Sequence, residues 1–253
     1  MKPLILIPAR MAASRLPGKP LADIAGRAMV LRVLDLALAA DLGPVAVAAA
    51  EAEVADLVRD AGGRAVLTDP DLPSGSDRVF AAAQALDPDG RHDVVINLQG
   101  DLPALPIGYL QAVLEPLRHS DSCDIGTLVA PVTSAEEARA EQVVKAVCAF
   151  GPGARVARAL YFSRACVPWS GAAEGWRQAW HHLGLYAYRR EALARFVRLP
   201  PGRLERLEKL EQLRALEAGM QIGCARVEAA PFGVDTPEDL ERIRAHFRER
   251  GLP

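Results

Sequence analysis

Short apolar runs alternate with helix-length amphipathic stretches through the first half of this chain, and this alternation constrains its fold more than any other feature. Parallel strands need a long crossover between them, usually a helix, so repeated strand–helix pairs predict a parallel sheet covered by helices on both faces. We therefore expect an α/β fold with a mostly parallel, mixed central sheet flanked by helices. The predicted strands are residues 4–9, 45–48, 64–67 and 93–98, and the predicted helices are residues 29–40, 51–61 and 77–86.

The pattern changes after residue 120, where longer apolar stretches follow one another. The turn sequence Gly151-Pro152-Gly153 predicts a hairpin between two of these stretches. We treat residues 1–253 as a single domain, with a core from residues 1–120 and 220–253 and a smaller mixed region at 121–219. The strands expected here are 124–132, 143–150, 155–162, 182–188 and 221–227, with an irregular loop at 165–180 and helices up to residue 217.

Two late helices carry different signals. One predicted helix has leucines at 204, 207, 210, 213 and 216. At 100° per residue these leucines wind through about 240°, so their spacing does not assign Glu211 or Gln212 to a face. The last helix begins more clearly, because Thr236 is a good N-cap residue and Pro237 suits the first helical position.

The charge balance excludes one broad class of function. The chain has 30 Lys and Arg against 32 Asp and Glu, a formal charge of −2. A general nucleic-acid binder or anionic-membrane binder would need a basic surplus. We therefore expect neither nucleic acid nor a membrane as a partner.

The cysteines and apolar runs indicate the compartment. The four cysteines lie far apart with no C-x-x-C pair, which fits neither a zinc module nor a small disulfide scaffold. The apolar run at 4–7 is too short for a signal-peptide core, and no stretch approaches the roughly 20 apolar residues of a membrane span. We expect a cytoplasmic protein.

A basic loop follows the first predicted strand. Residues 8–20 contain Arg10, Arg15 and Lys19, and no acid precedes Asp23. In an open α/β sheet the loop after the first strand is a favoured place for a ligand, and cations with backbone N–H groups suit a polyphosphate. The loop is neither a P-loop nor a dinucleotide fingerprint. The alternative to a polyphosphate-binding loop is a solvated basic turn without a ligand.

Two aspartates are candidates for a metal site. Asp101 follows the strand predicted at 93–98, where a carboxylate points into the ligand crevice of a parallel sheet. Asp235 precedes the last helix, so a strand-to-helix junction also explains it, just as a turn or a helix cap also explains Asp101. If both reach one crevice, they form a two-carboxylate site of the kind that holds magnesium in phosphoryl transfer.

Two further segments have both structural and functional explanations. Residues 73–78 cap a helix, for which Ser76 or Asp77 suffices, although the Ser-Gly-Ser loop can also present backbone groups to a nucleobase. On the strand predicted at 182–188, alternation places His182 and Tyr186 on one face with Gly184 and Tyr188. A lone histidine there is more often structural than catalytic.

Seven segments in order resemble one family. The segment I-P-A-R-x-x-x-S-R-L-P-G-K-P-L at 7–21 resembles the opening signature of the 3-deoxy-D-manno-octulosonate (Kdo) cytidylyltransferases, also called CMP-Kdo synthetases. Six further stretches, which together extend the resemblance over nearly the whole chain, are residues 74–78, 99–101, 161–164, 182–186, 210–214 and 233–240.

The resemblance implies a cytoplasmic, Mg²⁺-dependent enzyme that couples CTP to Kdo, giving CMP-Kdo and pyrophosphate for lipopolysaccharide synthesis. It also implies a Rossmann-like nucleotidyltransferase fold. Residues 1–120 and 220–253 would then form a nucleotide-binding core, and the smaller region would bind the sugar and form a homodimer.

The resemblance also implies roles for individual residues. Arg10, Arg15, Lys19 and Asp101 would be catalytic, and Asp101 and Asp235 would ligate the magnesium ion. The Kdo site would comprise Gln99, Arg164, His182, Tyr186, Glu211 and Gln212, of which the arginine suits a sugar carboxylate. The nucleotide would contact Pro8, Ala9, Arg10, Ser14, Arg15, Lys19, Ser74, Gly75 and Arg78.

The chain departs from the family pattern at two places. Many members carry Thr-Asp where this chain has Ala49-Ala50, and an acid where it has Leu102. The alternative substrates are an amino variant of Kdo or another sugar acid such as a sialic acid. A nucleotide-binding regulatory protein on a degenerate transferase fold is the alternative from another class.

Overall fold

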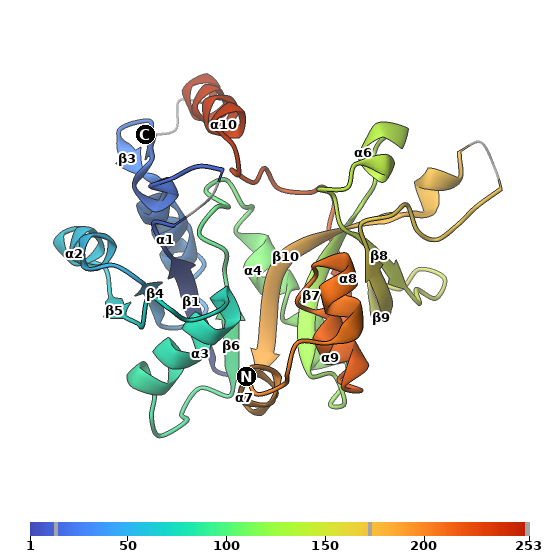
Figure 1. The fold of residues 1–253 in the computed structure, drawn as a ribbon, viewed down its shortest axis with the longest axis horizontal. Helices are drawn as coiled ribbons and strands as arrows, with labels where there is room; N and C mark the ends of the chain where they lie inside the picture. Colours follow the sequence, from blue (N-terminus) through green and yellow to red (C-terminus); the bar gives the residue numbers. More distant parts are fainter. Residues whose placement is uncertain (13–14, 172–173, 251–253) are drawn as a thin grey trace. The chain divides into compact units, whose positions relative to one another are not determined.

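The computed structural model describes residues 1–12, 15–171 and 174–250, and these form two compact units (Figure 1). Unit 1 comprises residues 1–110 together with the C-terminal segment from residue 231, and unit 2 comprises residues 111–230. That unit 1 binds the nucleotide and unit 2 the sugar stays a prediction from the resemblance.

Unit 1 contains a parallel sheet with strand order β5-β4-β1-β6. A small antiparallel pair, β2 and β3, precedes the first long helix. The elements are β1 (Pro3–Ala9), the 3-10 helix η1 (Lys19–Leu21), β2 (Asp23–Ile24), β3 (Arg27–Ala28), α1 (Met29–Ala39), β4 (Val45–Ala49), α2 (Ala52–Asp60), β5 (Ala65–Leu67), α3 (Gly75–Leu86), β6 (Val94–Asn97), α4 (Gly108–Ala112) at the boundary, and α10 (Pro237–Glu249).

The inner strands of this sheet are buried on both faces. Every residue of β4 and β6 is buried, and β1 departs from this only at Pro8. Helices α1, α2 and α3 pack against β1 and β4 and surround them in Figure 1. Burial on both faces explains why these strands are continuous apolar runs rather than alternating ones. The predicted α/β fold is confirmed.

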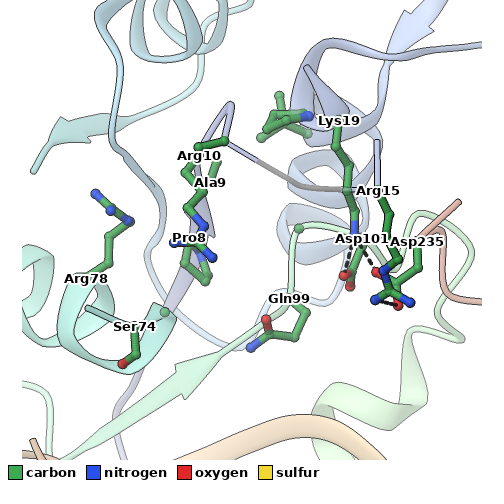
Figure 2. Close-up of a pocket in the computed structure, with 15 residues that line it drawn as sticks. Pro8, Ala9, Arg10, Arg15, Lys19, Ser74, Arg78, Gln99, Asp101 and Asp235 are labelled. Atoms are coloured by element: carbon green, nitrogen blue, oxygen red, sulfur yellow. Dashed lines mark hydrogen bonds and ion pairs between the residues drawn. The ribbon is translucent and has the colours of Figure 1, made fainter. Parts of the chain in front are cut away.

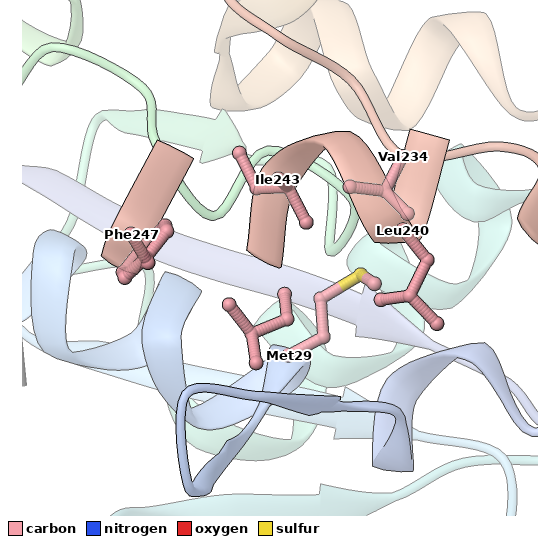
Figure 3. Packing of buried hydrophobic residues seen from close by; sticks show 6 residues of the cluster. Met29, Val234, Leu240, Ile243 and Phe247 are labelled. Carbon is pink, nitrogen blue, oxygen red and sulfur yellow. The ribbon is translucent and has the colours of Figure 1, made fainter. Parts of the chain in front are cut away.

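The C-terminal helix α10 belongs to unit 1 through an apolar cluster. Leu240, Ile243 and Phe247 of α10 pack with Met29 at the start of α1 and with Val234 (Figure 3). Fully burying side chains of this size contributes about 1.5–3 kcal/mol each. The cluster therefore brings the segment before α10 back to the parallel sheet from the far end of the chain.

The start of α10 agrees with its prediction. The Thr236 Oγ1 accepts a hydrogen bond from the Asp239 N–H at 3.2 Å, and the Asp239 carboxylate accepts one from the Thr236 N–H at 3.1 Å. This reciprocal pair is a capping box, and Pro237 takes the first helical position.

The described residues of unit 2 contain five strands that form a closed ring. β10 pairs with β7, β7 with β11, β11 with β9 and β9 with β8, and a further pairing of β8 with β10 closes the order. Among these described strands only the β7–β11 pair is parallel, so the sheet of this unit is mixed. The elements are α5 (Glu115–His119), β7 (Ile125–Pro131), α6 (Ala135–Arg139), β8 (Lys145–Cys148), β9 (Val156–Ser163), the 3-10 helix η2 (Gly175–Gln178), β10 (Trp180–Arg189), α7 (Arg190–Phe196), α8 (Arg203–Glu208), α9 (Leu213–Glu217) and β11 (Ile222–Arg226).

The local predictions for unit 2 have mixed outcomes. The hairpin is confirmed, because β8 and β9 are antiparallel and the Ala154 N–H bonds the Gly151 carbonyl across the turn. The loop predicted at 165–180 contains the short helix η2 and the start of β10. The prediction of one leucine-bearing helix is wrong, because the segment forms two helices, α8 and α9, and the first ends before Lys209. Lys209 has a φ of 55° in the left-handed region, which ends the first helix.

The described residues contain no helix long and apolar enough to cross a membrane. Cys123, Cys148, Cys166 and Cys224 are all free thiols.

Candidate active site

A cavity of about 310 Å³ lies at the carboxyl ends of β1 and β6 in unit 1 (Figure 2). Its volume is at the lower end of the range for small-molecule sites. The predicted nucleotide-binding residues line it, except Ser14, which lies outside the described residues. The lining residues are Pro8, Ala9, Arg10, Ala12, Arg15, Lys19, Pro20, Val30, Ser74, Gly75, Arg78, Gln99, Gly100, Asp101 and Asp235.

Lys19 joins the two predicted metal ligands. Its Nζ lies 2.8 Å from Asp101 Oδ2 and 2.9 Å from Asp235 Oδ1, and Figure 2 shows both contacts. Burial alone would lower the pKa of Lys19, but the two carboxylates raise it above its usual value. Burial alone would raise the pKa of Asp235, but Lys19 and Arg15 lower it. The structure therefore brings both carboxylates to one ammonium, and their contacts favour the charged forms of Lys19 and Asp235.

Local backbone geometry places Lys19 there. Gly18 has a φ of 71°, a left-handed conformation that side chains rarely adopt, and η1 begins at the next residue with Pro20 as its second. The Gly18 N–H also donates to the Met11 carbonyl at 3.2 Å, which closes the base of the basic loop.

Two main-chain features bring Asp235 to Asp101. The Val234 N–H donates to the Asp101 carbonyl at 3.0 Å, and the capping box at Thr236 begins directly after Asp235. An exposed ion pair adds Arg15, whose Nη2 lies 3.1 Å from Asp235 Oδ2. Exposed pairs of this kind contribute at most about 1 kcal/mol, so we assign the placement of Asp235 to the backbone and to α10.

The donor set at Asp101 and Asp235 fits magnesium. Magnesium prefers oxygen ligands and is usually held by one or two carboxylates, with phosphate oxygens and water completing its octahedron. The described residues contain no group of three or more His, Cys, Asp or Glu side chains that could hold a metal by themselves. The two carboxylates attract cations, as their contacts with Lys19 show. A magnesium ion bound there would take its remaining ligands from phosphate and water.

Close packing of main chains shapes the other side of the cavity. A Cβ on Gly100 would lie 3.1 Å from the Pro8 carbonyl oxygen, tighter than ordinary contact, so the turn after β6 approaches the end of β1 closely. Helix α3 begins beside Pro8 at Gly75, where an added Cβ would meet the proline ring at 3.7 Å. This puts the N-terminus of α3, with its N–H groups, at the cavity wall.

The cap of α3 is not the one the sequence favours. Ser76 and Asp77 are the predicted capping residues, but the N-cap is Ser74, whose Oγ accepts from the Asp77 N–H at 3.2 Å. The Ser74 hydroxyl also donates to Asp77 Oδ2 at 2.6 Å. In this structure Ser74 therefore lines the cavity and caps the helix at once.

Arg78 has a clear structural role. Its guanidinium is buried and donates to Thr68 Oγ1 at 2.6 Å and to the main-chain carbonyls of Asp69 and Pro70 at 3.0 and 3.3 Å. Burial lowers its pKa. The side chain thus holds the segment after β5, and its contact with a nucleotide stays a prediction.

The positions where this chain lacks acids of the family pattern are apolar and buried. Ala49, Ala50 and Leu102 are all buried, and none is among the described residues that line the cavity. The Ala50 N–H continues the pairing of β4 with β1 by donating to the Ala9 carbonyl at 2.9 Å. These three residues therefore belong to the buried apolar packing around the cavity.

The predicted sugar-binding residues fall in both units. Gln99 lines the cavity of unit 1, where its Nε2 donates to Asn97 Oδ1 at 3.0 Å. The others lie in unit 2, where they form two groups: His182 and Tyr186 on β10, and Arg164, Glu211 and Gln212 next to the junction of α8 and α9.

His182 and Tyr186 share one face of β10, as predicted. Their ring centroids lie 5.6 Å apart, although a bulge shifts the register between them. The His182 Nε2 is hydrogen-bonded to Thr127 Oγ1 at 3.0 Å, and burial lowers the pKa of His182 to about 3. Burial, with further contributions from Tyr188 and Glu211, raises the pKa of Tyr186 well above its usual value. Both rings are neutral at physiological pH, and Glu211 interacts electrostatically with Tyr186.

Arg164 is held by the main chain of the α8–α9 junction. Its Nε donates to the Glu208 carbonyl at 2.8 Å, its Nη1 to the Glu141 carbonyl at 2.9 Å and its Nη2 to the Lys209 carbonyl at 3.3 Å. A sugar carboxylate would have to use the second N–H of each Nη atom. Arg164 therefore ties β9 to the segment that leads into Glu211 and Gln212.

The sequence analysis missed two residues that organise this group. The Glu208 carboxylate accepts from the Arg164 N–H at 2.9 Å and from the Ser163 hydroxyl at 2.7 Å. The buried Lys145 donates to three main-chain carbonyls, including that of Arg164 at 2.5 Å. Neither residue has a spacing that marks it, because each makes a contact with Arg164 that is distant in sequence.

Comparison with known proteins gives a consistent assignment. Residues 4–222 match the cytidylyltransferase family. A 3-deoxy-manno-octulosonate cytidylyltransferase of Rhodospirillum centenum is 61% identical over 96% of this chain and 92% of its own length. The enzyme of the same name from Parvibaculum lavamentivorans is 58% identical over 99% of this chain and 94% of its own length.

The fold agrees with a solved structure of CMP:2-keto-3-deoxy-manno-octonic acid synthetase complexed with CTP. That structure aligns with a TM-score of 0.90 and 38% identity, covering 99% of this chain and all of the other. With the cavity, its basic loop and its paired carboxylates, these matches show that the chain belongs to the cytidylyltransferase family and, within it, to the 3-deoxy-manno-octulosonate cytidylyltransferases.

Proposed function

We propose that this chain transfers CMP from CTP to the anomeric hydroxyl of Kdo, giving CMP-Kdo and pyrophosphate. The observation that carries the proposal is the ammonium of Lys19 held between Asp101 and Asp235 in a cavity beside a basic loop. The names and complex of the relatives supply the nucleotide and the sugar acid. The cations and the paired carboxylates of the cavity support the binding of a metal-bound triphosphate.

The charged residues of the cavity have distinct tasks. Arg10, Arg15 and Lys19 would bind the triphosphate and stabilise the negative charge that builds on the leaving pyrophosphate. Asp101 and Asp235 would hold magnesium, which when bound supplies a Lewis acid for phosphate and sugar oxygens. Lys19 contacts both carboxylates, so its ammonium would lie next to the bound magnesium ion and the phosphates of CTP.

The reaction needs positioning more than covalent participation by the protein. The sugar hydroxyl oxygen forms a bond to the α-phosphorus, the bond from that phosphorus to the β-phosphate bridging oxygen breaks, and the hydroxyl proton passes to solvent. Holding the reactants in line and neutralising charge account for most of the acceleration in such transfers. We assign binding of the sugar acid to Gln99, Arg164, His182, Tyr186, Glu211 and Gln212.

A panel of sugar acids tests the substrate. With CTP and Mg²⁺, we expect pyrophosphate release with Kdo to exceed that with a sialic acid or an amino variant of Kdo by at least about tenfold in kcat/KM, a difference of about 1.4 kcal/mol. Turnover of another acid without turnover of Kdo would contradict the assignment. CTP binding without turnover of any acid would favour a regulatory protein on this fold.

The metal site predicts the effect of removing one carboxylate. Asp101→Asn keeps the shape of the side chain but removes its charge, so we expect kcat to fall by about 100-fold or more. Calorimetry should show that Mg²⁺ increases CTP affinity in the wild type but not in the variant. Asp89→Asn, at an exposed carboxylate paired with Arg91, is the control and should behave as the wild type. An unchanged rate in Asp101→Asn would remove Asp101 from the mechanism.

The buried His182 predicts a pH dependence of stability. Its folded pKa of about 3 lies below the unfolded value of about 6.5, so between these values the unfolded chain binds a proton that the folded chain does not. The free energy of unfolding therefore falls as pH drops below about 6.5, by roughly 2 kcal/mol at about pH 5.

Urea unfolding of the wild type and His182→Asn at pH 7.5, 6 and 5 measures this contribution. The variant lacks the titration of His182, so the free energies of unfolding of the two proteins should converge as pH falls. His119→Asn, at an exposed histidine of α5, should keep the pH dependence of the wild type. A constant difference between wild type and His182→Asn across this range would show that His182 does not titrate in this way.

We also propose that the enzyme is a homodimer that works in the cytoplasm and supplies lipopolysaccharide synthesis. The family resemblance supports the dimer, and four free thiols suit a reducing compartment. Light scattering at micromolar concentration should give twice the mass of the chain, and a monomer at all concentrations would overturn the dimer.

A further inference from the structure

We propose that Glu51 is a positioning residue for CTP, because its carboxylate fixes the main chain at Met11, next to Arg10 and hydrogen-bonded to Gly18 beside Lys19. The proposal rests on the proposed function for the identity of the nucleotide. It assigns Glu51 no contact with the reacting atoms.

The position of Glu51 in the fold leads one to expect a different role. It is the N-cap residue of α2, with a φ of −117° and a ψ of 146°, where a side chain ordinarily accepts a hydrogen bond from its own helix. The Glu51 side chain makes no such cap. Its Oε2 instead accepts from the Met11 N–H at 3.0 Å, 40 residues earlier in the chain.

Met11 is the point at which both ends of the basic loop meet. Its N–H is held by Glu51, and its carbonyl accepts the Gly18 N–H at 3.2 Å. Arg10 directly precedes Met11, and Lys19 directly follows Gly18. A single residue, Met11, therefore sets where two of the cavity's cations leave the main chain, and the Glu51 carboxylate anchors its N–H to the start of α2.

The charge of Glu51 also suits this place. Burial lowers the pKa of Arg78, and Glu51 opposes that effect whereas Arg10 adds to it. The carboxylate thus lies among cations that repel one another when no phosphate is bound. A hydrogen bond to a charged acceptor is worth more than a neutral one, so the anchor is stronger than an amide would provide.

Three variants separate these contributions. Glu51→Ala removes the acceptor and the charge, and we expect a loss of CTP affinity and a rise in KM for CTP of about tenfold, the effect of one hydrogen bond to a charged group. KM for Kdo should stay within twofold of the wild type. Glu51→Gln keeps an acceptor for the Met11 N–H but loses the charge, so its CTP affinity should lie between those of the wild type and Glu51→Ala. Glu53→Ala removes an exposed carboxylate from the first turn of the same helix and should match the wild type.

The measurements are CTP binding by calorimetry without any sugar acid, and the separate KM values in turnover. An unchanged CTP affinity in Glu51→Ala would overturn the inference. So would an equal rise in both KM values with a large drop in Tm, which would indicate general destabilisation, or a Glu51→Gln variant as impaired as Glu51→Ala. If the wild type binds CTP but does not turn over Kdo, the proposed substrate fails while the calorimetry still decides the role of Glu51.

Discussion

One ammonium between two carboxylates is the interaction on which this site depends. Lys19 lies 82 residues from Asp101 and 216 from Asp235 in sequence, yet its Nζ is within 3 Å of both. Burying charge is costly unless opposite charge is close, so these three side chains stabilise one another in the half-buried cavity. The same arrangement lowers the pKa of Asp235 and so favours its ionised form, the state in which a carboxylate binds a metal.

Apolar packing is what makes this electrostatic contact available. Asp235 reaches the cavity because α10 packs through Ile243 and its neighbours on the start of α1, and because Val234 bonds the main chain at Asp101. The cluster stabilises the return of this segment to unit 1, and the ion pairs form in the geometry that results. Stability and function are therefore linked through a helix that supplies no side chain of its own to the cavity.

Apart from the cap of α3, the predictions succeeded where the signal was local and failed where contacts with distant backbone atoms decided. Alternation along β10 correctly placed His182 and Tyr186 on one face. The leucine spacing before β11 predicted one helix, but the left-handed turn at Lys209 divides it, and the Lys209 carbonyl there accepts from Arg164. Glu208 and Glu51 were missed for the same reason, because each carboxylate acts on a peptide N–H from another part of the chain.

The sequence by itself determined the parallel sheet, the basic loop after β1 and the residue types from which we propose a metal–triphosphate site, because apolar periodicity, turn residues and charge are local properties. Only the tertiary structure decided that Asp101 and Asp235 meet at Lys19, that Glu51 anchors Met11 rather than capping α2, and that burial keeps His182 neutral. Each of these depends on the distance between groups far apart in the chain. Such distances are fixed by packing. The energy of packing is distributed over many side chains, so no single sequence motif predicts these distances.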